Sequence, residues 1–201
     1  ILFMNSSICW RSIIYGRRSD GKWEETSMLP VGSLENAMPK RRGYSMKSYG
    51  MKDIGCVRSE NQDNIFYTDA PIGMLSNLYI VADGMGGHNA GAYASKYVTD
   101  QLVDNARKSK GWDVIAFLEN VLKQLNYQLL KKGSEEEAYA GMGTTTVAAS
   151  EKDGKLYVVN VGDSRLYHIH DGEMKQITVD HSYVQELISA GVIDKEDGRN
   201  H

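Results

Sequence analysis

Apolar and polar residues alternate along the chain after residue 47 in the manner of β-strands. Short runs rich in β-branched and aromatic residues are bounded by polar breaks, which is typical of strands. This pattern predicts strands over 48–57, 63–69, 76–82, 143–151, 155–162, 164–170 and 173–178. Asp153-Gly154 and Asp171-Gly172 each lie between two of these runs, and Asp-Gly between apolar runs is a strong hairpin signal. We therefore expect antiparallel rather than parallel sheets.

Three segments predict helices, over 90–107, 112–131 and 181–190. The second has a stripe at a spacing of 3.6 residues, which is typical of a helix face packed on a core. This stripe consists of Val114, Leu118, Val121, Leu122, Leu125 and Leu129. The charged stretch 131–137 predicts a solvated loop. Together with the hairpins, the helices predict an α+β fold in which helices cover antiparallel sheets.

Residues 1–46 show no clean period and predict an extension outside the domain. They mix Gly, Ser, Arg and Pro with scattered Trp and Met, whereas an ordered pattern begins directly after Met46. We expect this stretch to be disordered or to result from a misassigned start of the reading frame. The domain itself is expected over 47–201.

The composition of the 201 residues, 41% hydrophobic and 24% charged, is typical of a soluble globular protein. The net charge of −3 is unevenly divided: residues 1–47 carry eight Lys and Arg against four Asp and Glu, and residues 48–201 carry fifteen against twenty-two. Because phosphate backbones need clustered Lys and Arg, the acidic body argues against nucleic acid as a partner. Two distant cysteines suggest a reduced compartment. Since no apolar run could span a membrane, we expect no membrane partner. The cytoplasm is the expected location, and a monomer is the expected state.

Asp83 lies where the apolar run 78–82 ends and a glycine-rich turn begins. Its carboxylate and the carbonyl of Gly84 are oxygen ligands of the kind that Mg²⁺ takes, and the glycines let backbone and ion approach closely. The alternative is a capped turn between a strand and a helix, without any ligand.

Arg58 and Asp163 are further candidates for chemistry. Arg58 presents a planar fork that suits phosphate oxygens, although a surface pairing with Glu60 is the alternative. Asp163 interrupts an apolar run, so it is either tied to Arg165 and Ser164 or a metal ligand. The segment GMGTTTVAA at 141–149 is by itself structural, because Thr and Val favour strands.

Together these segments resemble the metal-dependent Ser/Thr protein phosphatases of type 2C (the PPM family), and closely its bacterial branch. Five motifs occur in the order of the family over residues 47–201. They are G-x-x-R-x-x-N-Q-D at 55–63, V-A-D-G-M-G-G-H at 81–88, G-M-G-T-T at 141–145, V-G-D-S-R at 161–165 and D-H-S-Y-V at 180–184. The resemblance implies a four-layer αββα fold, in which a β-sandwich is flanked by helices.

The resemblance also implies a cluster of Mn²⁺ or Mg²⁺ ions. Its ligands are Asp83 as the bridge between two ions, Gly84 through its carbonyl, Asp63 through water, and Asp163 for a third, weaker ion. Two bridged ions lower the pKa of a shared water, so that hydroxide is available near neutral pH. Arg58 is implied to hold the substrate phosphate while this hydroxide attacks phosphorus in line.

The general acid is less defined. Met85 stands where eukaryotic members of the family carry a histidine, and His88 is the candidate for that duty. The alternative for His88 is a surface or capping residue after a glycine-rich turn.

The implied activity is hydrolysis of phosphoserine and phosphothreonine on proteins. The implied partner is a bacterial Ser/Thr kinase, whose phosphorylation of proteins this activity reverses. The family supplies two further metal aspartates from downstream strands that this chain does not reach. We therefore expect a domain that is incomplete at its C-terminus, binds metal weakly and has little activity. A catalytically silent regulatory or binding module on the same fold is the alternative. A nucleotide-binding protein is disfavoured, because the glycine-rich turn lacks the final glycine of a dinucleotide fingerprint.

Overall fold

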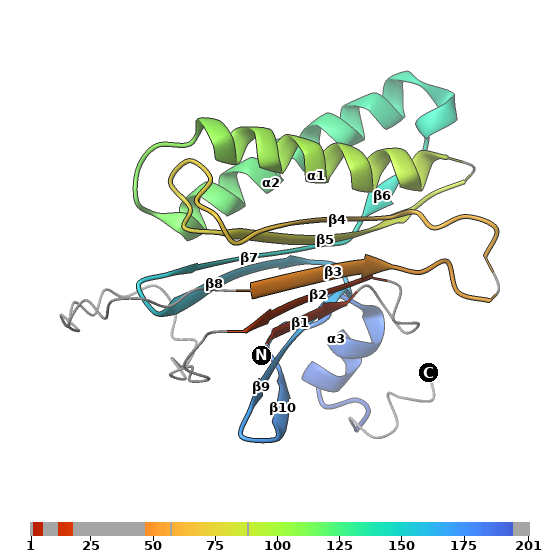
Figure 1. The fold of residues 1–201 in the computed structure, drawn as a ribbon. Coiled ribbons are helices and arrows are strands. Elements are labelled where there is room, and N and C mark those ends of the chain that lie inside the picture. The colour runs from red at the N-terminus through yellow and green to blue at the C-terminus, as the bar shows by residue number, and fades with distance from the viewer. Residues whose placement is uncertain (1, 6–11, 18–46, 57, 88, 195–201) are drawn as a thin grey trace.

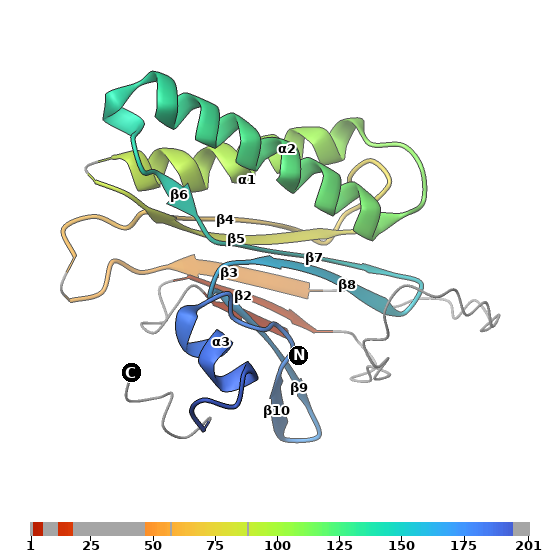
Figure 2. The ribbon, with the colours of Figure 1, turned by 180° about the vertical axis from the view of Figure 1, so that it is seen from behind.

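The computed structural model of the chain describes residues 2–5, 12–17, 47–56, 58–87 and 89–194. Two antiparallel sheets lie one upon the other (Figure 1). Helices α1 (Ala90–Lys108) and α2 (Val114–Glu135) cover the outer face of one sheet, and the short α3 (Tyr183–Ser189) lies beyond the other, as both views show (Figure 2). The predicted α+β fold with antiparallel sheets and helical cover is confirmed.

The helix-covered sheet has the strand order β4-β5-β7-β8. Its members are β4 (Asp63–Thr68), β5 (Leu78–Met85), β7 (Thr146–Lys152) and β8 (Lys155–Val161), and the two-residue β6 (Gly143–Thr144) pairs with the end of β5. Strand β5 is paired on both sides, and residues 78–82 are at most 2% exposed. A strand buried on both faces reads as a continuous apolar run, as β5 does.

Successive side chains of β5 point to opposite faces and feed two separate cores. Leu78 and Ile80 pack with the buried stripes of α1 and α2. The other face forms the inter-sheet layer, which consists of Tyr79, Val81, Val147, Ala149 and Leu166. The stripe predicted for 112–131 is confirmed, because five of its six members are buried and Leu122 is partly buried against the same core.

Helix α2 runs to Glu135 and is followed by a 3₁₀ turn, Glu137–Tyr139, so the solvated loop predicted for 131–137 is wrong. Lys132 bonds Glu136 one turn later, at 2.7 Å, and lies over the rings of Tyr93 and Tyr139. Ion pairs between residues i and i+4 stabilise a helix, and here they extend it through a stretch whose charges suggested a loop.

The second sheet has the order β10-β9-β1-β2-β3. Its strands are β1 (Leu2–Asn5), β2 (Ser12–Arg17), β3 (Lys47–Lys52), β9 (Arg165–His170) and β10 (Glu173–Gln176). Both predicted hairpins are confirmed, β7–β8 and β9–β10. Their Asp-Gly pairs have positive φ at both residues, which a tight two-residue turn between twisted strands requires.

Two stretches of the predicted N-terminal extension belong to this sheet. Strand β1 pairs with β9, and β2 pairs with β1 and β3. For these two stretches the structure differs from the prediction, because short apolar and β-branched runs such as LFMN and SIIY can pair within a sheet even without a long period. The other residues of 1–46 lie outside the described part of the chain, so the domain boundary stays a prediction.

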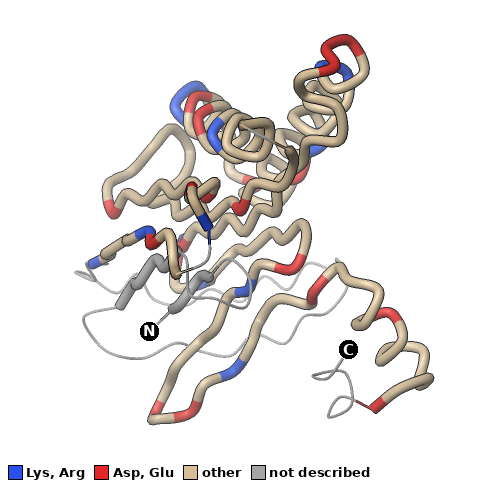
Figure 3. The backbone as a smooth tube through the Cα atoms, turned by 90° about the vertical axis from the view of Figure 1, so that its right-hand side faces the viewer, with Lys and Arg blue, Asp and Glu red and all other residues tan. Residues whose placement is uncertain are grey.

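Charged residues of both signs are interspersed on α1 and α2 (Figure 3). Lys96 pairs with Asp100 and Lys123 with Glu119 along the exposed sides of these helices. Of the helices in the described ranges, none is long and apolar enough to cross a lipid bilayer.

The end of β5 and the start of α1 meet backbone to backbone. A Cβ on Gly84 would lie 2.0 Å from the carbonyl oxygen of Gly91, and a Cβ on Gly91 would lie 2.8 Å from the carbonyl carbon of Gly84. The glycines therefore set how closely helix and strand approach.

We predict that Leu118→Ala lowers the free energy of unfolding by about 2–5 kcal/mol, because it leaves a cavity where the side chain is fully buried. Denaturant titration followed by circular dichroism measures the change. Leu130→Ala on the same helix is the control: this side chain is 63% exposed, so its loss should cost less than about 0.5 kcal/mol. Equal costs for the two variants would contradict this packing.

We also predict that Gly84→Ala destabilises the fold by about 1–3 kcal/mol, since the added methyl forces the backbone of β5 and α1 apart. The matched control is Gly87→Ala in the same turn, where a Cβ meets nothing within 4 Å. Thermal unfolding compares the two. A Gly84→Ala variant as stable as Gly87→Ala would show that the close approach is not needed.

Candidate metal centre

Asp63 and Asp83 lie directly opposite each other on β4 and β5. Opposed residues of an antiparallel pair carry their side chains on the same face, with Cβ atoms about 4.5–5.5 Å apart. Asp63 is 4% exposed and Asp83 is half-buried. The structure therefore brings together two carboxylates that stand twenty positions apart in the sequence.

The pair occupies one end of the inter-sheet layer. Asp83 follows Val81 at a spacing of two, and Asp63 precedes Ile65 in the same way, so the carboxylates share the face that these apolar side chains bury between the sheets. At this end the layer changes from apolar to acidic. A polar end of a buried layer is a place where ligands bind without a break in the core.

The backbone of Asp83 is held by two threonines. The N–H of Asp83 donates to Thr145 Oγ1 at 3.1 Å, and its carbonyl accepts from the N–H of Thr145 at 2.9 Å. Thr144 Oγ1 donates to the same carbonyl at 3.0 Å. The motif G-M-G-T-T, which by itself looked structural, thus fixes the main chain of the central acidic residue. The signal for this role in the sequence was a pair of threonines directly after Gly143.

Asp63 is fixed by Asn61 and Lys52. Asn61 Oδ1 accepts from the N–H of Asp63 at 2.8 Å, while its amide donates to the carbonyl of Asp53 at 2.6 Å. Lys52 Nζ donates to the carbonyl of Asp63 at 3.0 Å. Asn61 therefore closes the loop between β3 and β4 onto the start of β4, a role that the sequence did not assign.

Arg58 lies in this loop, between β3 and β4, and its side chain is exposed. A guanidinium at an exposed position keeps its five donors available for an incoming anion. Gly84 follows Asp83 on β5, and its N–H donates to the carbonyl of Gln62 at 3.2 Å, which joins the two halves of the site at the backbone. His88 lies outside the described residues.

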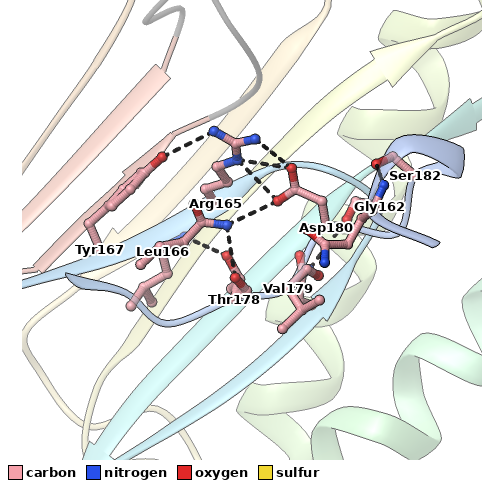
Figure 4. A network of polar contacts seen from close by, with 11 residues as sticks. Gly162, Arg165, Leu166, Tyr167, Thr178, Val179, Asp180 and Ser182 are labelled. Atoms are coloured by element: carbon pink, nitrogen blue, oxygen red, sulfur yellow. Dashed lines mark hydrogen bonds and ion pairs between the residues drawn. The ribbon is translucent and has the colours of Figure 1, made fainter. Parts of the chain in front are cut away.

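Asp163 lies in the turn between β8 and β9 and is half-buried. Its neighbour Arg165 pairs with Asp180: Nε lies 3.0 Å from both carboxylate oxygens and Nη2 lies 2.6 Å from Oδ2 (Figure 4). These hydrogen bonds raise the pKa of the Arg165 guanidinium above its ordinary value. This geometry argues against the alternative in which Asp163 pairs with Arg165, because the guanidinium of Arg165 is directed to Asp180 instead.

The D-H-S motif braces the same turn. The N–H of His181 donates to the carbonyl of Gly162 at 3.0 Å, and the N–H of Gly162 donates to His181 Nδ1 at 3.3 Å. Ser182 then caps α3 by accepting from the N–H of Gln185. The helix predicted from His181 therefore begins later, with Ser182 as its N-cap. His181 instead holds Gly162, the residue before Asp163.

The donor set of the Asp63–Asp83 pair fits a hard divalent cation. Two carboxylates and a neighbouring carbonyl oxygen are ligands that Mg²⁺ and Mn²⁺ accept, and such ions complete their shells with water. Among the described residues, no group of three or more His, Cys, Asp or Glu side chains comes together to hold an ion. The Asp63–Asp83 pair, with Gly84, is the set on which a metal site would be built, and Asp163 stands apart from it.

Comparison with known proteins gives a consistent answer. Residues 48–187 match the family Protein phosphatase 2C. The chain is 36% identical over 158 residues to the serine/threonine phosphatase stp of Listeria innocua, a match that covers 74% of this chain and 60% of that protein. This chain therefore spans about 60% of the length of that relative.

Solved structures agree. The serine/threonine phosphatase Stp1 from Staphylococcus aureus is 37% identical, with a TM-score of 0.65, and the match covers 72% of this chain and 57% of that one. The catalytic domain of the serine/threonine protein phosphatase PstP, solved with two manganese ions, is 28% identical, with a TM-score of 0.62, over 98% of this chain and 64% of that one. With a family match over most of its length, opposed carboxylates at the end of the sandwich and this architecture, the chain belongs to the Protein phosphatase 2C family.

Proposed function

We propose that this chain carries part of a centre that hydrolyses phosphoserine and phosphothreonine on proteins. The observation that supports this most directly is the opposition of Asp63 and Asp83 across β4 and β5. Carboxylates at directly opposed positions share one face of the sheet and lie close enough to bind the same divalent cation. The bacterial relatives named as serine/threonine phosphatases support the same activity.

The residues of the pair would hold two Mn²⁺ or Mg²⁺ ions. Asp83 is the proposed bridge, Gly84 offers its carbonyl oxygen, Asp63 acts through water, and Asp163 holds a third and weaker ion. Ions bound here lower the pKa of a shared water and so supply hydroxide near neutral pH. The manganese ions of the PstP catalytic domain support this choice of metal.

Arg58 is proposed to bind the phosphate of the substrate. Asn61 anchors the two ends of its loop to each other and to Asp63, and the guanidinium is exposed. A planar fork binds phosphate oxygens in a bidentate manner and neutralises the charge that develops on them. Neither Arg58 nor Asp83 acts as a nucleophile in this proposal, because the attacking group is water.

The proposed partners are phosphorylated proteins and the Ser/Thr kinase that modifies them, and the proposed location is the cytoplasm. A second candidate is a silent binding module on the same fold. It is favoured by the observation that, in the described parts of the chain, the acidic pair is not joined by a third metal-ligating side chain. We therefore expect Mn²⁺ to bind weakly and turnover to be slow.

We predict that Asp83→Asn weakens Mn²⁺ binding at least about tenfold, because an amide cannot supply the charge of the bridging ligand. Free Mn²⁺ measured by electron paramagnetic resonance gives the affinity. Asp100→Asn, which changes an exposed carboxylate paired with Lys96 on α1, should leave it unchanged.

The same samples distinguish the two candidate functions when p-nitrophenyl phosphate is added with Mn²⁺. Slow turnover that disappears in Asp83→Asn supports the phosphatase. Binding of Mn²⁺ without any turnover favours the silent module, and an Mn²⁺ affinity that does not depend on Asp83 sinks the proposed centre altogether.

We predict that Arg58→Ala weakens the binding of inorganic phosphate to the Mn²⁺-loaded protein about tenfold, since a charge-assisted hydrogen-bonded contact contributes about 1.5–3 kcal/mol. Titration calorimetry with phosphate measures it. Mn²⁺ affinity should stay within about twofold of the parent. Arg107→Ala, at an exposed arginine paired with Asp104, is the control and should bind phosphate normally.

A further inference from the structure

Two hydroxyls lie in contact between the sheets, beside the acidic pair. Thr145 Oγ1 and Ser164 Oγ are 2.6 Å apart, and the two residues are 7% and 0% exposed. Thr145 immediately precedes β7 of the helix-covered sheet, and Ser164 immediately precedes β9 of the second sheet. The contact is therefore a polar link from one sheet to the other, in a place that solvent does not reach.

Each hydroxyl is linked directly to a residue proposed as a metal ligand. Thr145 Oγ1 accepts from the N–H of Asp83, and the N–H of Thr145 donates to the carbonyl of Asp83. Ser164 directly follows Asp163. A continuous path thus runs from the backbone of Asp83 through two hydroxyls to the residue next to Asp163.

Close packing supports this path. Gly162 has a φ of +92°, and a Cβ there would lie 2.8 Å from Thr145 Cγ2 and 2.9 Å from Thr145 Cβ. The side chain of Thr145 thus occupies the space that a side chain at 162 would take. His181 holds Gly162 through two hydrogen bonds. The Arg165–Asp180 pair holds the start of β9 (Figure 4). The Asp163 turn is therefore packed on Thr145 at Gly162 and is tied on either side of Asp163, at Gly162 and at Arg165.

Hydroxyls are a costly way to fill this space. A buried hydroxyl must be desolvated and then hydrogen-bonded, whereas Val and Ala would fill the same volumes without polar atoms. Side chains of the inter-sheet layer two residues further on, Val147 and Leu166, are in fact apolar. At Thr145 and Ser164, close to Asp83 and Asp163 along the chain or by hydrogen bond, the filling is polar instead, which indicates that the bond itself matters there.

We propose that the Thr145–Ser164 pair is a positioning device that sets the Asp163 turn against Asp83, so that metal binding at the Asp63–Asp83 pair depends on the turn. This rests on the metal-binding roles proposed above. Neither hydroxyl touches substrate or the reacting atoms; each acts by holding the segment that bears a carboxylate.

The test compares two substitutions of one residue. Thr145→Val keeps the shape and removes the hydroxyl, whereas Thr145→Ser keeps the hydroxyl and removes the methyl group. Mn²⁺ affinity is measured by electron paramagnetic resonance, and folding is checked by circular dichroism. We expect Thr145→Val to weaken Mn²⁺ binding about three- to tenfold and Thr145→Ser to stay within about twofold of the parent, because a net hydrogen bond is worth about 0.5–1.5 kcal/mol.

Thr99→Val is the matched control for the loss of a buried hydroxyl. Thr99 is 3% exposed on α1 and donates to the carbonyl of Ser95, so its loss should lower stability and leave Mn²⁺ affinity unchanged. Ser164→Ala removes the contact between the two hydroxyls alone and should also weaken Mn²⁺ binding, by no more than Thr145→Val, which in addition removes the acceptor of the Asp83 N–H. In the double variant the loss should equal that of Thr145→Val, since the contact between the hydroxyls is already gone.

The inference is overturned if a folded Thr145→Val binds Mn²⁺ like the parent, or if Thr145→Ser binds as weakly as Thr145→Val. Should Thr145→Val fail to fold, Ser164→Ala decides in the same way: parent-like Mn²⁺ affinity overturns the inference. A failure of the proposed function looks different, because Mn²⁺ affinity would then be insensitive to Asp83→Asn as well.

Discussion

The inter-sheet layer is the constraint on which the candidate site depends. Strand β5 is hydrogen-bonded on both sides and buried on both faces, so its register cannot slip by one residue without moving every side chain to the wrong core. That register places Asp83 opposite Asp63 and in line with the apolar side chains between the sheets. The acidic pair is therefore positioned by hydrophobic packing some residues away, and the threonines at 144 and 145 only refine what the packing has set.

Much of this arrangement could be predicted from the sequence, because the signals are local. The two Asp-Gly turns predicted antiparallel pairing, since a two-residue turn can join antiparallel strands and cannot join parallel ones. The apolar stripe of α2 predicted its buried face. The end of α2 was missed because Lys132 has partners on two other segments, at Tyr93 and Tyr139, which no local pattern contains. The strands near the N-terminus were missed because sheet pairing can recruit runs too short to show a period.

For the site, too, local features could be predicted from the sequence and contacts between distant segments could not. Asp63 and Asp83 were found as acids at strand ends, and their opposition follows from the pairing of neighbouring strands. The partner of Arg165 could not be inferred, because Asp180 is brought to it by the β9–β10 hairpin and the segment that follows. The contact between Thr145 and Ser164 crosses from one sheet to the other, and periodicity within either strand contains no information about it.

The pairing of β4 with β5 has a consequence for the order in which the chain folds. These strands are joined by residues 69–77 alone, whereas β5 and β7 are separated by both long helices. Since closing a short loop costs less conformational entropy than closing a long one, the two carboxylates can meet before the threonines that hold Asp83 arrive. The hairpin that brings the carboxylates together can therefore form before the hydrogen bonds that hold the main chain of Asp83.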